Sequence, residues 1–267
     1  MKKRAPKPSS LASSTTWLDH PGLSADRKKL HKQCKSAGIL DSLPNIEAFA
    51  RPAISLLVKK RAPKELCVGR IGGAPDFPPS MDWPVAAKRP LGFVAQLDLN
   101  ALAAFDLQNE LPKEGLLSFF AALDPNKPRY GSAAVVCHAT GPMTPRSNPT
   151  PWGSKTVGWL IPKLRLSLPY HEDEACERVG LSDDDRESYH DEVFLAFAPD
   201  EHAHQVLGYG TQGTGPGIEG HRLLAQFDSD DRIDFDVGDY ETLRFFVEPT
   251  AFRSFDLAKV TCTMEMA

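Results

Sequence analysis

A short pattern of residues occurs twice in this chain, in the same order and at similar spacing. The copies are Ala95-Gln96-Leu97-Asp98 with Leu117-Ser118-Phe119-Phe120, and Ala225-Gln226-Phe227-Asp228 with Leu243-Arg244-Phe245-Phe246, offset by 130 and 126 residues. A glycine turn precedes each copy, at 71–73 and at 207–209. Three landmarks in the same order predict two related halves, and the period is far too long for a solenoid.

The apolar pattern predicts an α+β fold of mostly antiparallel β structure, internally duplicated, with a few peripheral helices. Apolar runs at 91–99 and 116–123 predict strands. A further strand over 155–168 is expected to break at Pro162, because proline cannot donate to a sheet ladder. Two short β-prone runs, at 53–58 and 65–68, predict a hairpin or a pair of edge strands.

We divide the chain at residue 50. Residues 1–50 form a basic amino-terminal tail, expected to be flexible to about Thr16, and a short helix that Ser24 is expected to cap. Residues 51–267 form the duplicated domain, with halves of about 51–140 and 154–267 and a proline-rich linker between them. A second helix is expected after Ser182, with Tyr189, Val193, Phe194 and Phe197 on its buried face.

Composition restricts where the protein works. No run approaches the ~20 apolar residues that cross a bilayer, and the amino-terminal residues lack the apolar core of a signal peptide, so we expect a cytoplasmic protein that binds no membrane. Residues 1–67 carry 14 Lys and Arg against 5 Asp and Glu, but the remainder is acidic and lacks a basic and aromatic platform. We therefore expect no nucleic-acid binding.

Metal and cofactor sites find little support in the sequence. The five cysteines form no C-x-x-C pair. The run from Asp228 to Asp239 contains six aspartates, but it departs from the calcium-loop template and is better explained as a solvated connection between strands. The glycines at 69–73 are not followed by the Lys-Ser or Lys-Thr of a phosphate loop. We expect no metal and no cofactor.

Catalytic groups are equally sparse. Cys137 and His138 are neighbours in an apolar strand, where successive side chains point to opposite faces, so they do not form a dyad. His202 and His204 stand beside acidic residues and could share one face, but polar connectors often carry such residues without function. His204 is the better candidate because it belongs to the segment before the second glycine turn.

The two repeated glutamines are the most informative polar residues. Gln96 and Gln226 occupy matching places in apolar strands, where a buried amide without partners costs roughly 1 to 3 kcal/mol. Each amide could hold its own glycine turn. Alternatively, both could line a shared cleft with Tyr209, Gln212 and Arg222.

These segments together resemble the YwqG-like family, a bacterial domain of unknown function. The residues that carry the resemblance are 70–84, 92–99, 111–120, 204–212 and 222–239, within a match from about Arg51 to the carboxyl terminus. This family usually has a tryptophan where this chain has Val237. The resemblance implies a duplicated β-rich fold in a bacterial cytoplasm and carries over no catalytic residue.

Two functional hypotheses follow. The first is a non-enzymatic binding or regulatory module with a protein partner, for example a toxin that it neutralises. The second is a small-molecule-binding protein or an enzyme with a site between the two halves, because duplicated lobes often leave a concave junction. We expect binding rather than catalysis.

Overall fold

The computed structural model describes residues 15–64, 66–123, 133–150, 154–198, 203–210, 218–237 and 242–265. Most of the amino-terminal tail lies outside the described residues. The helical segments of the described chain are η1 (Thr15–Asp19), η2 (Pro21–Leu23), α1 (Ser24–Ser36), η3 (Leu40–Ser42), α2 (Leu43–Phe49), α3 (Leu99–Leu102), α4 (Glu174–Val179), α5 (Asp183–Ser188), η5 (Tyr189–Phe194), η6 (Leu195–Phe197), η7 (Asp231–Ile233), α6 (Pro249–Ser254) and η8 (Leu257–Lys259).

One large antiparallel sheet organises the molecule. Its strand order is β14-β13-β12-β11-β1-β10-β2-β6-β7-β8, and two small two-stranded sheets pair β3 with β9 and β4 with β5. The strands are β1 (Arg51–Lys59), β2 (Gly69–Ile71), β3 (Asp76–Phe77), β4 (Val85–Ala86), β5 (Arg89–Pro90), β6 (Gly92–Asp98), β7 (Leu116–Ala121), β8 (Ala134–Ala139), β9 (Thr144–Pro145), β10 (Gly158–Ser167), β11 (Gln205–Val206), β12 (Arg222–Asp228), β13 (Thr242–Val247) and β14 (Val260–Glu265).

The sheet curls into a nearly closed, barrel-like body. Its last strand, β14, contacts β8 at the other end of the strand order. Three phenylalanines meet inside: the ring of Phe119 lies 5.1 Å from that of Phe227 and 5.0 Å from that of Phe245. Edge-to-face packing of fully buried rings joins the two ends of the sheet through one apolar core.

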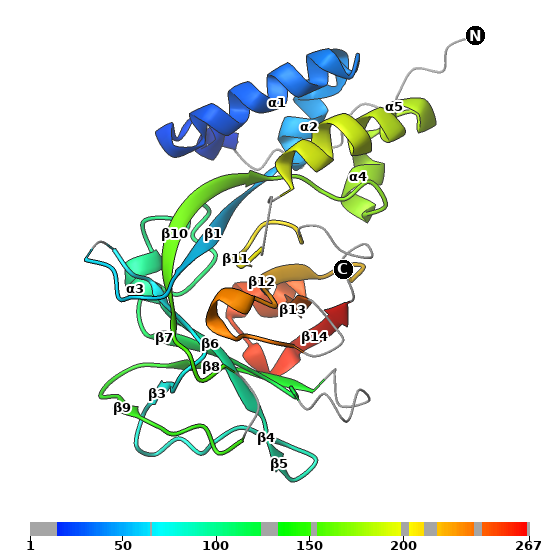
Figure 1. Cartoon of the computed structure of the whole chain (residues 1–267). Helices are drawn as coiled ribbons and strands as arrows, with labels where there is room; N and C mark the ends of the chain where they lie inside the picture. Colours follow the sequence, from blue (N-terminus) through cyan, green and yellow to red (C-terminus); the bar gives the residue numbers. More distant parts are fainter. Residues whose placement is uncertain are drawn as a thin grey trace.

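A layer of helices covers one end of the sheet. Figure 1 shows α1, α2, α4 and α5 gathered at this end, above β1 and β10. Their buried side chains, including Leu30, Ile46 and Tyr189, form a second apolar core with Leu164 and Leu166 of β10. The mostly antiparallel β fold with a few helices is thus confirmed.

Pro162 does not interrupt β10. It pairs with Leu56 of β1, and the Leu56 N–H donates to the carbonyl of His204 on the opposite side of β1. In an antiparallel ladder, the N–H and C=O groups of two directly opposed residues either both face the partner strand or both face away from it. Because those of Leu56 face away from β10, those of Pro162 face away from β1. On that side β2 pairs only with residues 158–160 of β10. The proline therefore removes no ladder hydrogen bond, and the predicted break is wrong.

The predicted hairpin over 51–68 is also wrong. β1 lies in the middle of the sheet between β10 and β11, so it is not an edge strand either, and residues 66–68 form no strand. Each central strand pairs into the far part of the chain: β1 with β11, and β10 with β2. Such long-range pairing leaves no local signal in the sequence.

The strand order has a regular internal correspondence. The central strands of the order are β1 and β10. From them outward, β2, β6, β7 and β8 on one side correspond in position to β11, β12, β13 and β14 on the other. β6 and β12 carry an irregularity at the same place, between Phe93 and Ala95 and between Leu223 and Ala225. Gln96 pairs with Ser118, and Gln226 pairs with Arg244.

Candidate functional site

A cleft of about 1070 Å³ lies beside the helical layer. Its walls come from the ends of α2 and β1, the loop after α3, α4, the turn after β11, β12 with the residues before it, β13 and α6. The described lining residues are Phe49, Arg51, Gln108, Asn109, Glu110, Glu172, Asp173, Ala175, Glu177, Arg178, Gly208, Tyr209, Gly210, Ile218, Glu219, Gly220, His221, Arg222, Leu223, Phe246, Pro249 and Phe252.

Among the described residues, Arg51 is a cation of the cleft that forms no ion pair. It is the first residue of β1 and is partly buried, and its guanidinium carbon lies 4.2 Å from the centroid of the Tyr209 ring. Within the described part of the chain its guanidinium makes no hydrogen bond or ion pair. Burial lowers the pKa of the guanidinium, although the nearby tyrosine opposes the change. Glu110 and Asp173 of the cleft lining also favour its charged form, without forming an ion pair with it. An arginine remains charged at neutral pH, so this position offers charged N–H donors that no described residue accepts.

Tyr209 holds the floor of the cleft in place. Its hydroxyl donates a hydrogen bond of 2.7 Å to the carbonyl of Phe49, and its N–H donates to the hydroxyl of Ser167. Burial raises the pKa of the phenol. The side chain is therefore a fixed, neutral aromatic surface under Arg51.

Arg222, the second arginine of the cleft, is already paired. Both of its terminal nitrogens donate to the two carboxylate oxygens of Glu110, in a bidentate pair. The guanidinium carbon also lies 5.2 Å from the centroid of the Phe252 ring. Because Glu110 is engaged by Arg222, it is not available to accept hydrogen bonds from Arg51.

The mouth of the cleft is acidic. Glu172, Glu177 and Glu219 are exposed there, with Arg178 as the exposed residue of opposite charge. The apolar part of the wall consists of Leu223, Phe246 and Phe252, all at most 5 % exposed. The cleft thus has a positive floor, an apolar side and a negative rim.

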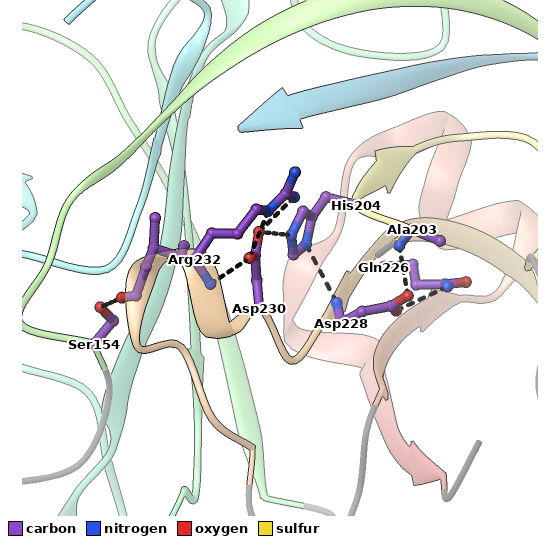
Figure 2. A network of polar contacts seen from close by, with 8 residues as sticks. Ser154, Ala203, His204, Gln226, Asp228, Asp230 and Arg232 are labelled. Carbon is purple, nitrogen blue, oxygen red and sulfur yellow. Dashed lines mark hydrogen bonds and ion pairs between the residues drawn. The ribbon is translucent and has the colours of Figure 1, made fainter. Parts of the chain in front are cut away.

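A second polar cluster lies apart from the cleft, around Asp230. The Nε2 atom of His204 lies 3.3 Å from the Asp230 carboxylate, and Arg232 donates to the same group from its backbone N–H, Nε and Nη2 (Figure 2). Burial alone would raise the pKa of Asp230, but the hydrogen bonds from His204 and Arg232 outweigh it and hold that pKa well below its usual range.

The other side of His204 also has a defined partner. Its Nδ1 atom accepts the N–H of Asp228 at 3.2 Å, so the ring proton lies on Nε2 and points to Asp230. The Asp228 carboxylate accepts from the N–H of Ala203 and from the amide of Gln226, as Figure 2 shows. His204, Gln226 and Asp230 are all at most 2 % exposed. This cluster ties the strands together; its inner residues are closed to solvent, and the exposed Arg232 covers it from outside.

Gln96 has a comparable holding role in the first half of the chain. Its amide oxygen accepts the Asp76 N–H and Arg70 Nη2, and its amide nitrogen donates to the Asp76 carbonyl and the Ser118 hydroxyl. The amide therefore holds the loop after the glycine turn. In the second half, Gln205 rather than Gln226 serves the turn, donating to the carbonyls of Leu207 and Tyr209.

The residues singled out from the sequence therefore separate into three places. Tyr209 and Arg222 line the cleft, His204 and Gln226 belong to the Asp230 cluster, and Gln96 lies against Asp76. The predicted cleft shared by both glutamines is not formed by the described residues. Gln212 lies outside the described residues. Sequence reasoning missed Arg51 and Glu110, since a lone arginine before a strand and a glutamate in a loop carry no signal.

Neither a metal centre nor a membrane helix is found in the ranges that the structure describes. No group of three or more His, Cys, Asp or Glu there is arranged to hold a metal ion. In the same ranges, no helix is long and apolar enough to cross a membrane.

Comparison with known proteins gives a family and no activity. The family model described as "Domain of unknown function (DUF1963)" matches residues 69–265, which include β2 to β14 and most of the cleft. A search of the curated proteins finds no match.

Proposed function

The chain belongs to the DUF1963 family, a domain of unknown function, and from this premise we propose that it is a binding protein whose cleft takes a small organic molecule. The observation that carries the proposal is Arg51. A partly buried guanidinium that lines a large cleft, rests on an aromatic ring and forms no ion pair with the described residues is a ready site for a ligand.

The remaining groups of the cleft favour binding over catalysis. The Tyr209 hydroxyl is engaged by a backbone carbonyl, and the Glu110 carboxylate is engaged by Arg222 through both oxygens. A general base needs a free lone pair within reach of the proton that it removes. The Glu110 carboxylate is held in its charged form by Arg222, which disfavours its taking up a proton, and the Tyr209 hydroxyl is fixed on a backbone carbonyl, whereas both are well placed to shape a pocket.

A protein partner has weaker support. The large apolar side chains exposed among the described residues are Leu40, Leu57, Leu66, Val85 and Leu195, on five different segments. Scattered single residues of this kind are ordinary on protein surfaces. The cleft is the more specific feature, so the small-molecule hypothesis is preferred to the partner or toxin-neutralising hypothesis.

The proposal includes an evolutionary part and a cellular part. The matching strand order, the two irregularities and the paired Gln96 and Gln226 support an internal duplication in which the halves exchange their first strands, β1 and β10. The YwqG-like motifs support a bacterial, cytoplasmic setting. The cleft would then lie where the second half meets the loop at 108–110 of the first.

The proposal can be tested by blocking the cleft. Ala175 of α4 lines it, so Ala175→Trp should fill part of the space, whereas Glu187→Trp places the same side chain on the exposed surface of α5. A library of small charged metabolites is screened by thermal shift against the wild type and both variants. We expect compounds that stabilise the wild type and Glu187→Trp but not Ala175→Trp. Compounds that stabilise all three equally, or none at all, would contradict the proposal.

A further inference from the structure

We infer that the ligand of the cleft is a small zwitterion with an apolar side group, of the amino acid or short-peptide class, whose carboxylate binds Arg51 and whose ammonium group faces the acidic mouth. This inference rests on the proposed function and specifies the chemistry of its ligand. Three features of the cleft carry it: one guanidinium at the floor whose N–H groups no described residue accepts, an apolar wall and a negative rim.

The carboxylate follows from the open donors of Arg51. Arg222 is taken up by Glu110 in a bidentate pair, and Asp173, another half-buried carboxylate of the lining, acts on Arg51 without forming an ion pair with it. The guanidinium presents N–H groups that no acceptor in the described residues occupies. A planar carboxylate with one negative charge matches both the donor geometry and the charge.

The rim argues against ligands that are only anionic. Glu172, Glu177 and Glu219 are exposed at the mouth and face one exposed cation, Arg178. A cleft lined by one sign of charge concentrates ligand groups of the opposite sign. A phosphate dianion would be repelled at the rim and only half neutralised at the floor, whereas an ammonium group is attracted.

The apolar wall and the volume define the rest of the ligand. Leu223, Phe246 and Phe252 offer buried apolar surface between the floor and the rim. Small-molecule sites usually enclose roughly 300 to 1,000 Å³. At about 1070 Å³ the cleft exceeds the needs of one amino acid and has room for a short peptide.

A set of probes that share one phenyl ring separates these contributions. Binding of phenylalanine, 3-phenylpropionate, phenethylamine, phenyl phosphate and the dipeptide alanyl-phenylalanine is measured by calorimetry at pH 7 with the full chain. We expect the two zwitterions to bind more tightly than 3-phenylpropionate, and phenethylamine and phenyl phosphate to bind most weakly. Tighter binding of the dipeptide than of phenylalanine would identify short peptides as the ligand, and the reverse would identify single amino acids.

Variants then locate the carboxylate. Arg51→Met should weaken the binding of the zwitterions and of 3-phenylpropionate by about 10- to 100-fold, the loss expected for a charged hydrogen bond. The affinity for phenethylamine should stay unchanged. Arg61→Met is the matched control, because Arg61 is exposed just beyond the other end of β1. Melting of each variant is measured first, and Arg51→Lys, which keeps the charge, replaces Arg51→Met should the latter fail to fold.

The outcomes separate this inference from the function that it refines. The inference that the ligand is a zwitterion would be overturned if Arg51→Met lost as much affinity for phenethylamine as for the anions. It would also be overturned if phenyl phosphate bound most tightly of all the probes. If no phenyl probe binds but other compounds are blocked by Ala175→Trp, the inference fails and the binding function stands. If the cleft-blocking variant changes no binding of any kind, both fail.

Discussion

At the scale of single residues, buried polar side chains in this protein hold loops against strands. Gln96 shows this most fully, since its one amide makes four hydrogen bonds to residues from three segments of the chain. A buried donor or acceptor that loses its partner costs about 1 to 3 kcal/mol. The residue thus specifies where the loop at 74–77 lies.

Gln96→Leu should therefore destabilise the protein. It leaves the Ser118 hydroxyl and the Asp76 backbone without their partner, so we expect a loss of about 2 to 4 kcal/mol and a melting temperature lower by roughly 5 to 10 °C. Gln33→Leu on α1 is the control and should melt like the wild type, because the half-buried Gln33 side chain makes no hydrogen bond to the described residues. Calorimetry measures both. Unchanged melting of Gln96→Leu would show that the amide does not hold the loop.

Asp230 couples stability to pH. Its pKa is depressed in the folded protein, so the charged form is favoured there, and the stability it contributes is present above the unfolded pKa of about 4 and is lost as the pH falls below it. Asp230→Asn should cost about 3 kcal/mol at pH 7, because the pairs with His204 and Arg232 are lost.

Denaturant unfolding at several pH values tests this sign. The gap between the wild type and Asp230→Asn should be full at pH 7 and shrink steadily below pH 4. The exposed neighbour Asp231 provides the control, and Asp231→Asn should follow the wild type. A gap that is constant from pH 7 to pH 3 would show that the charge of Asp230 is not involved.

At the scale of elements, local signals identified most segments, and long-range pairing decided the rest. The predicted strands at 91–99 and 116–123 are β6 and β7, and Ser182 caps α5 by accepting the Asp185 N–H. Ser24 does not cap α1, which begins at that residue and has Leu23 at its cap position. The position of β1 and the continuity of β10 depended on partners more than a hundred residues away.

The turn after β11 illustrates how closely elements approach. Gly208 has a φ of 75°, and an added Cβ would lie 2.7 Å from the Cβ of Ala53. Gly180, at the end of α4, has a φ of 76° but has nothing within 4 Å of such an atom. Both glycines have a left-handed backbone, but only Gly208 is closely packed. Comparing the two positions therefore distinguishes the cost of backbone strain from that of steric contact.

Substituting alanine at both positions measures the two effects. Gly180→Ala should cost about 1 kcal/mol, the penalty of a left-handed backbone for a residue with a Cβ. Gly208→Ala should cost clearly more, by roughly 1 to 3 kcal/mol, because β1 must shift to relieve the overlap. Urea unfolding compares them, and equal losses would mean that the turn after β11 does not press against β1.

At the scale of the whole molecule, the curled sheet and the helical layer leave a cleft that the sequence did not describe. Tyr209 and Arg222, singled out from the sequence as companions of the two glutamines, line this cleft without them. Their companions Arg51 and Glu110 come from segments far away in the chain, and only the fold brings them to the same floor. Motif reasoning favoured the repeated glutamines because they recur, but recurrence here marks residues that hold the fold rather than residues of the cleft.

The central claim is that the guanidinium of Arg51 binds the ligand. Arginine side-chain N–H resonances, recorded in a ¹H–¹⁵N spectrum during titration with phenylalanine and alanyl-phenylalanine, test it most directly, with the Arg51 signal assigned by its absence in Arg51→Lys. The account predicts that the Arg51 Nε–H signal shifts in a saturable manner while that of Arg61 stays in place. Saturable binding that leaves the Arg51 signal unmoved would contradict it.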